Sequence, residues 1–176
     1  MHMKPTWKVV QKEAFKVAGY GIETDIAKGQ YTKDVAAFWE NYDGENLESK
    51  LYRILEPPRH GEVGMCVPRN GGRVTYLLGV VVEDFSKAGP DMIRVEVPAA
   101  EYAVFTTTPV DTTEDMEQKA FAAVIKETWR TIFEDWFPQS GYVYDEEGMD
   151  FEFYDERCHH VSDTVMEIYI PVKKTT

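Results

Sequence analysis

The chain has 176 residues, and its 31 acidic residues against 19 Lys and Arg residues give a formal charge of −12. A surface that neutralises nucleic-acid phosphates needs the opposite charge, so the composition argues against direct nucleic-acid binding. Hydrophobic residues make up 43% and aromatic residues 13% of the chain, which excludes disorder as a description of the whole. We therefore expect a folded, globular protein with a core of ordinary size.

The chain shows no pattern of a membrane or secreted protein. Its longest apolar run, near residues 77–82, is far shorter than the roughly 20 residues of a membrane-spanning helix. The N-terminal residues lack the basic stretch and apolar run of a secretory signal. Cys66 and Cys158 are too few and too far apart for a disulfide framework. We expect free thiols, a cytoplasmic location and no membrane contact.

The first residues of the chain have the composition of strands. Residues 7–13 and 15–24 are rich in β-branched and aromatic side chains, and we expect these two strands to pair with each other. Helical spacing of apolar residues follows over 35–42 and again over 47–55. Pro57-Pro58 ends the helical region, because proline lacks the amide proton and disfavours helix in the preceding residue.

A hairpin follows this helical region. Residues 62–67 and 73–82 are predicted strands, and Asn70-Gly71-Gly72 between them can supply the positive φ angles of a tight connection. Its glycines lack the neighbouring Lys and Ser or Thr of a phosphate-binding loop, so we assign them to turn geometry.

The second half of the chain repeats this order. Residues 93–97 and 102–108 are predicted strands, a long helix follows, and residues 150–154 and 165–172 are the closing strands. The apolar stripe of the long helix should face the core, and it consists of Phe121, Val124, Ile125, Thr128, Trp129, Ile132, Phe133 and Trp136.

Each half therefore has the order strand, strand, helix, strand, strand. We expect one α+β domain over residues 1–176, built from a repeat at about 7–83 and a second at about 91–173, with a hinge at 83–90. The alternative is that an α+β chain of this size shows two such patterns by accident.

Three segments of the second half carry a resemblance to a known family. They are residues 129–142 with their Trp-x6-Trp-x5-Tyr spacing, Glu152-Phe-Tyr154, and the closing Glu167-Ile-Tyr-Ile-Pro-Val. The chain resembles the GyrI-like (gyrase-inhibitor-like) family, the effector-binding domain also found in AraC-type and MerR-type transcription regulators. Val17-Ala18-Gly19-Tyr20 supports the resemblance more weakly. It implies two α+β modules with pseudo-twofold symmetry, whose groove holds lipophilic, often cationic, small molecules beside an acidic residue among aromatic rings.

Alternation along the last strand singles out Glu167. The apolar residues of 165–172 share one face, which suits packing beneath helices, and Glu167 lies with Tyr169 on the opposite face. On a solvent-exposed sheet, Glu167 would be an ordinary solvated charge. In a groove between the repeats, it would attract a flat organic cation through ion pairing and cation–π contacts. Glu152 and Glu127 are the next candidates.

Several aromatic residues are candidates for the wall of such a groove. Tyr102 and Tyr154 are preferred, because Tyr154 alternates away from Phe151 and Phe153, which should face the core. The alternative for each tyrosine is a place at the core edge, and tryptophans on the apolar side of a helix are usually core residues. The complete set of candidate ligand-binding residues is Glu167, Tyr169, Tyr154, Tyr102, Trp129, Trp39 and Tyr20.

The remaining motifs do not indicate a cofactor or metal. Cys158-His159-His160 has no second Cys/His cluster to complete a metal site, and the acidic stretch 145–148 lacks the ligand spacing of a calcium loop. We expect a small-molecule-binding protein that sequesters its ligand or reports it, as a sensor, to an unidentified protein partner in transcription regulation. No helix-turn-helix pattern accompanies it. The alternative implied by the resemblance is a hydrolase that opens strained cyclopropane-bearing alkylating toxins, with Glu167 as general base.

Overall fold

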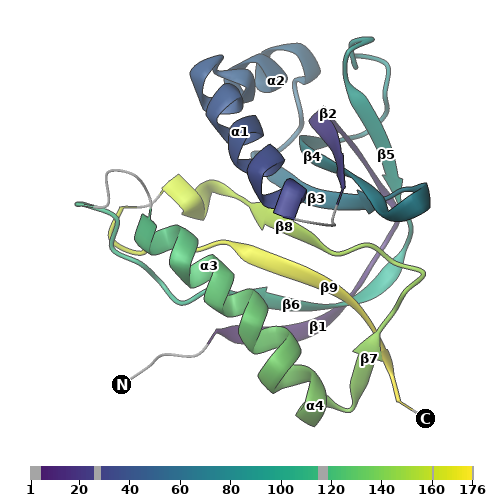
Figure 1. Ribbon diagram of the computed structural model, residues 1–176, viewed down its shortest axis with the longest axis vertical. Helices are drawn as coiled ribbons and strands as arrows, with labels where there is room; N and C mark the ends of the chain where they lie inside the picture. The colour runs from purple at the N-terminus through teal and green to yellow at the C-terminus, as the bar shows by residue number, and fades with distance from the viewer. Residues whose placement is uncertain (1–4, 26–28, 115–118, 160, 176) are drawn as a thin grey trace. The chain divides into compact units, whose positions relative to one another are not determined.

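The computed structural model describes residues 5–25, 29–114, 119–159 and 161–175 (Figure 1). The chain divides into two compact units: unit 2 is Ala14–Pro98, and unit 1 combines Met1–Glu13 with Ala99–Thr176. Each unit is an antiparallel sheet with helices packed on one face, which confirms the predicted α+β class. Within the described residues, no helix has both the length and the apolar character needed to cross a bilayer.

Unit 2 has the strand order β5-β2-β4-β3, and two helices lie between β2 and β3 along the chain. Apolar residues at helical spacing in α2, such as the fully buried Leu51, pack with Leu78 and Val80 of β4 in one core. The connection Asn70–Gly72 has positive φ at its two glycines, as predicted. The elements of this unit are β2 (Phe15–Asp25), α1 (Gln30–Gly44), α2 (Leu47–Leu55), β3 (Glu62–Pro68), β4 (Arg73–Val82) and β5 (Ile93–Val97).

Strands β2 and β4 approach each other closely at a glycine pair. Gly19 is directly opposite Gly79 in the register of these strands. A Cβ atom on Gly19 would lie 2.1 Å from the carbonyl oxygen of Leu78, which is a backbone atom that cannot rotate away. Only a residue without a side chain therefore fits at this crossing.

Unit 1 has the strand order β1-β6-β9-β8, with β7 also paired to β9. Its long helix α3 continues through a π-helical turn into α4, and α3 lies across the strands of this unit (Figure 1). The core consists of residues such as Phe105, Ile168 and the fully buried Ile132. The elements are β1 (Thr6–Lys12), β6 (Ala100–Thr106), α3 (Lys119–Thr131), the π-helix η3 (Ile132–Trp136), α4 (Phe137–Ser140), β7 (Tyr142–Tyr144), β8 (Phe151–Tyr154), the 3-10 turn η4 (Glu156–His159) and β9 (Glu167–Lys174).

The predicted pairing of the first two strands is wrong. β1 pairs with β6, from Thr6 opposite Thr106 to Lys12 opposite Ala100, while β2 pairs with β4 and β5. A two-residue hairpin needs positive φ angles, and neither Glu13 nor Ala14 has one. The expected repeat bounds therefore shift by one strand in each half: β1 belongs to unit 1 and β5 belongs to unit 2.

Candidate functional site

Two acidic residues of unit 1 lie on opposite faces of its sheet. In the register of β8 and β9, Glu152 is directly opposite Ile168, whereas Phe153 is opposite Glu167. Ile168 belongs to the core beneath α3, so Glu152 shares the helix-covered face. Glu167 projects from the other face, because successive side chains of a strand alternate. The sheet thus presents one carboxylate to each side.

Glu167 lies in a polar cluster formed by β9 and the turn η4. Its side chain is 12% exposed, and its Oε2 pairs with the guanidinium of Arg157 at 3.2 Å. The hydroxyl of Tyr169 donates to Glu167 Oε1 at 3.3 Å. Arg157 also donates from Nε and Nη2 to Asp155 at 2.7 to 3.1 Å, and these hydrogen bonds raise the pKa of Arg157. A cation of the protein itself, which is shared with Asp155, therefore already pairs with Glu167.

An aromatic group lies on the same face as Glu167. The rings of Phe151 and Tyr169 are stacked with centroids 4.6 Å apart, and Tyr102 meets Tyr169 edge-on at 5.7 Å. Tyr102 is fully buried, and its hydroxyl has no hydrogen-bond partner within the described part of the chain. Burial, with a smaller contribution from the charge of Asp145, raises the pKa of Tyr102 to about 12. Glu167, Tyr169 and Tyr102 thus share a face, as alternation predicted.

Glu152 is a partly buried acid between β8 and α3. Its Oε2 accepts a hydrogen bond from the hydroxyl of Tyr154 at 3.2 Å and a longer one from Trp129 Nε1 at 3.5 Å. No basic side chain among the described residues forms an ion pair with it. Burial raises the pKa of Glu152 to about 7, although the two hydrogen bonds oppose this change. Glu152 therefore titrates near neutral pH among neutral donors.

A second acid lies close to Glu152. The hydroxyl of Tyr144, on β7, donates to Asp150 Oδ2 at 2.7 Å. Burial raises the pKa of Asp150, and burial together with the charge of Asp150 raises the pKa of Tyr144. The charge of Asp150 also contributes to the raised pKa of Glu152. This face of unit 1 consequently carries two acids whose ionisation is opposed by their surroundings.

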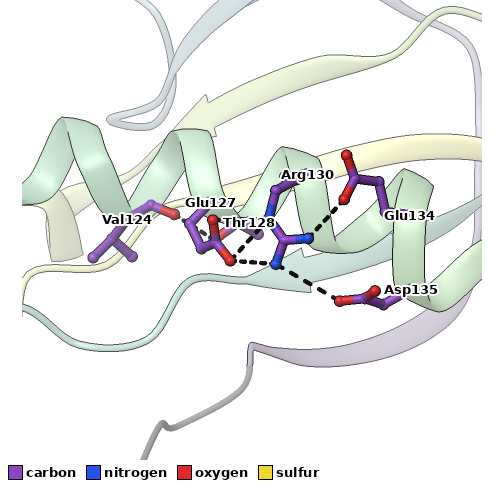
Figure 2. A network of polar contacts seen from close by, with 6 residues as sticks. All are labelled: Val124, Glu127, Thr128, Arg130, Glu134 and Asp135. Atoms are coloured by element: carbon purple, nitrogen blue, oxygen red, sulfur yellow. Dashed lines mark hydrogen bonds and ion pairs between the residues drawn. The ribbon is translucent and has the colours of Figure 1, made fainter.

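The outer surface of α3 carries a network centred on Arg130 (Figure 2). Arg130 makes a two-pronged contact with Glu127, reaches Glu134 Oε2 at 2.7 Å, and lies 3.8 Å from Asp135 Oδ2. All these side chains are exposed, so the network contributes little to stability in water. Glu127 is thus a solvated, paired charge and is a poor candidate for a ligand contact.

The two candidates in unit 2 pack as core residues. Tyr20 is buried, with the ammonium of Lys50 5.4 Å from the centroid of its ring. Trp39 packs against the same core and donates from Nε1 to the hydroxyl of Tyr76 at 3.1 Å. In unit 1, the corresponding indole of Trp129 reaches a carboxylate instead.

The predicted orientation of Tyr154 is wrong. Tyr154 packs against the core beneath α3, whereas Phe151 and Phe153 share the face of Glu167. The cause is that a charged residue, Glu152, takes an inward position of β8 opposite Ile168. When the apolar residues of β8 are assigned to the inward positions, every side chain of the strand is therefore placed on the opposite face. The predicted set is therefore divided between two faces of unit 1 and the core of unit 2.

Sequence reasoning missed Asp150, Tyr144 and Arg157 as parts of these clusters. The signal for Asp150 was present, because Asp150, Glu152 and Tyr154 recur at every second position and alternate with phenylalanines. Arg157 had no such signal, since η4 brings it to Glu167 from across a loop. In the motif considered for metal binding, Cys158 packs against the core of unit 1, and His160 lies outside the described residues.

Comparison with known proteins identifies a family. The family described as Cass2, integron-associated effector binding protein, matches residues 8–172. The chain is also 30% identical over 170 residues to the transcriptional regulator BrlR of Pseudomonas aeruginosa, an alignment that covers 94% of this chain and 54% of BrlR. The chain thus spans about half the length of this curated relative.

Solved structures agree on the fold. SAV2435, solved bound to tetraphenylphosphonium, is similar with a TM-score of 0.70 and 18% identity, covering 96% of this chain and 94% of that one. The integron cassette protein VCH_CASS2 from the mobile metagenome of Vibrio cholerae is similar with a TM-score of 0.62 and 15% identity, covering 97% and 98%. At these identities the likeness concerns the fold alone. On its sequence match and its architecture, the chain belongs to the Cass2 family of integron-associated effector-binding proteins and is a GyrI-like effector-binding domain, a small-molecule-binding module related to transcription regulators.

Proposed function

We propose that this protein binds lipophilic organic cations and that Glu152 supplies the negative charge of the site. The observation that carries this proposal is a largely desolvated carboxylate that accepts hydrogen bonds from two neutral donors, Trp129 and Tyr154. Ionising a buried carboxyl group without an opposite charge costs free energy. A bound cation supplies that opposite charge. Pairing with the carboxylate therefore offsets the cost of its ionisation and contributes favourably to binding.

The aromatic residues beside Glu152 suit the same ligand. The rings of Trp129 and Tyr154 both pack next to the core of unit 1 and both reach the carboxylate with their polar atoms. An aromatic face attracts a cation, and this attraction increases where water is excluded. A lipophilic cation gains from apolar burial, ring contact and charge pairing together, whereas a neutral or anionic analogue loses the last of these.

The sequence-based assignment of the ligand carboxylate to Glu167 stays a prediction. A cation at Glu167 would have to displace or share the guanidinium of Arg157, which already lies 3.2 Å from the carboxylate. Glu152 has no such competitor among the described residues. This difference is the reason for preferring Glu152.

The comparisons support this ligand class and a regulatory role. SAV2435, which shares the fold, was solved with a tetraphenylphosphonium cation, and BrlR is a transcriptional regulator. We infer that this chain, in the cytoplasm, sequesters a lipophilic cation or reports it to a protein partner. Its charge of −12 opposes direct binding to DNA by its own surface.

The comparisons do not favour the hydrolase alternative. A general base at Glu167 would need a carboxylate open to water, whereas Glu167 is mostly buried and engaged by Arg157 and Tyr169. Incubation with a cyclopropane-bearing electrophile tests this alternative. Product that accumulates beyond one equivalent and disappears in Glu167→Gln would revive it.

The binding proposal is tested with two ligands of nearly equal shape and opposite charge. Isothermal titration calorimetry at pH 8 should show binding of tetraphenylphosphonium and at least tenfold weaker binding of tetraphenylborate. Glu152→Gln keeps the size of the side chain and removes its charge, so it should abolish most of this preference. Glu167→Gln is the matched control and should keep it. Equal affinity for both ions in the wild-type protein would refute the proposal, and loss of the preference only in Glu167→Gln would return the site to Glu167.

A further inference from the structure

Trp129, Phe133 and Tyr144 of unit 1 form a row of neighbouring rings, which we call the terrace. The rings of Trp129 and Phe133 are inclined by only 4° with centroids 6.2 Å apart. The ring of Tyr144 continues the row, inclined by 29° to Phe133 with centroids 6.4 Å apart. Centroid separations of this size between nearly parallel rings are those of offset stacking. The rings of Trp129 and Phe133 are therefore displaced sideways relative to each other, and the ring of Tyr144 continues the row at a tilt.

Phe133, in the middle of the terrace, is not a core residue. The apolar stripe of the long helix predicts that it faces the core, but its side chain is 45% exposed, whereas its neighbour Ile132 is fully buried. The helix becomes a π-helix over Ile132–Trp136, and Phe133 is the second residue of this segment. The exposed part of a large apolar ring has an unfavourable hydration free energy, and a ligand that covers the ring removes this cost.

Both outer rings of the terrace carry a polar atom in contact with a buried acid. Trp129 Nε1 reaches Glu152, and the hydroxyl of Tyr144 donates to Asp150. The terrace is thus exposed at Phe133 and partly buried at Trp129 and Tyr144, and each of its two ends adjoins an acidic side chain. This combination is complementary to a ligand that is both flat and positively charged.

We propose that Phe133 is a specificity-determining residue, which selects flat polycyclic aromatic cations by stacking them on the terrace of Trp129, Phe133 and Tyr144. This inference rests on the proposed function, since it assumes that the cation is held by Glu152. A fused ring system can cover adjacent offset rings at once. A tetrahedral cation with four splayed phenyl groups can lay only one ring on the terrace and depends less on Phe133.

The test compares ethidium, a flat polycyclic monocation, with tetraphenylphosphonium, a tetrahedral monocation. Phe133→Leu keeps the apolar bulk and removes the ring, and it should weaken ethidium binding about tenfold, in the range of stacking effects seen on aromatic platforms. Tetraphenylphosphonium affinity should fall less than threefold. Phe133→Tyr keeps the ring and should restore ethidium binding to within about twofold of wild type.

Val143→Ala is the control for the loss of an exposed apolar side chain. Val143 is 39% exposed on β7, next to Tyr144 but outside the terrace, and its replacement should change neither affinity. If Phe133→Leu changes the ratio of the two dissociation constants by less than threefold, the inference is overturned. Wild-type protein that does not distinguish tetraphenylphosphonium from tetraphenylborate refutes the proposed function instead. Cation binding that depends on Glu152 but not on the ring of residue 133 refutes only the present inference.

Discussion

Replacing Glu152 by glutamine should stabilise the protein above neutral pH and change little in acid. Burial raises the pKa of Glu152 to about 7 in the folded protein, whereas a glutamate in an unfolded chain titrates near its ordinary value of about 4.3. Between these values the folded protein holds a proton that the unfolded chain has released. The contribution of Glu152 to stability is therefore fully present below the unfolded value and is lost as pH rises through the folded value.

The size of this loss follows from the two pKa values. The difference between about 7 and about 4.3 corresponds to about 4 kcal/mol of unfolding free energy by pH 8, because each pH unit is worth about 1.4 kcal/mol. Glutamine cannot ionise and keeps the acceptor for the hydroxyl of Tyr154 and the indole of Trp129. Glu152→Gln should consequently exceed the wild type by up to that amount at pH 8 and by little at pH 4.5.

Urea unfolding followed by tryptophan fluorescence at several pH values between 4.5 and 8 measures this difference. Glu127→Gln is the matched control, because Glu127 undergoes the same chemical change at an exposed position on α3. Saturating tetraphenylphosphonium should remove the pH-dependent loss in the wild type, and its affinity should fall about tenfold for each pH unit below 7. If the stability of Glu152→Gln follows that of the wild type at every pH, Glu152 is not a buried acid and the reasoning fails.

Three further expectations concern the fold. Arg157→Met should destabilise the protein by about 1–3 kcal/mol, because it leaves the mostly buried Glu167 without its cation, and adding Glu167→Gln should recover part of the loss in a double-mutant cycle. Ile132→Ala should cost about 2–5 kcal/mol in urea unfolding, since Ile132 is fully buried beside the π-helical turn; a smaller loss would mean that the site collapses around the cavity. Gly19→Ala should lower the melting temperature sharply, because its Cβ would lie 2.1 Å from a backbone oxygen. Gly44→Ala is the control, since a Cβ there meets nothing within 4 Å, and it should leave the melting temperature unchanged or raise it. Equal effects of the two substitutions would contradict the close approach of β2 and β4.

Local chemistry made much of the fold predictable. The end of the helical region at Pro57-Pro58, the positive φ angles at Gly71 and Gly72, and the alternation in β9 all follow from properties of single residues and their immediate neighbours. The family resemblance rested on contiguous segments and was confirmed by the match over residues 8–172. These features need no knowledge of distant contacts.

Partner choice in the sheet was not predictable in this way. Residues 7–13 and 15–24 are both sound strands, and adjacency in sequence favours their pairing, but β1 pairs with β6 instead. The choice depends on the short Glu13-Ala14 connection and on which edge is free once each unit has formed. Neither condition is visible in the composition of the strands themselves.

The candidate site shows the same division. The amino-acid sequence by itself is enough to predict an effector-binding fold, the shared face of Glu167 and Tyr169, and the abundance of aromatic side chains. Tertiary packing alone decides that Arg157 pairs with Glu167, that the indole of Trp129 on α3 contacts the partly buried Glu152, and that Phe133 is half exposed. The physical reason is that the cost of a charge depends on the dielectric and the countercharge around it, and segments far away along the chain supply both.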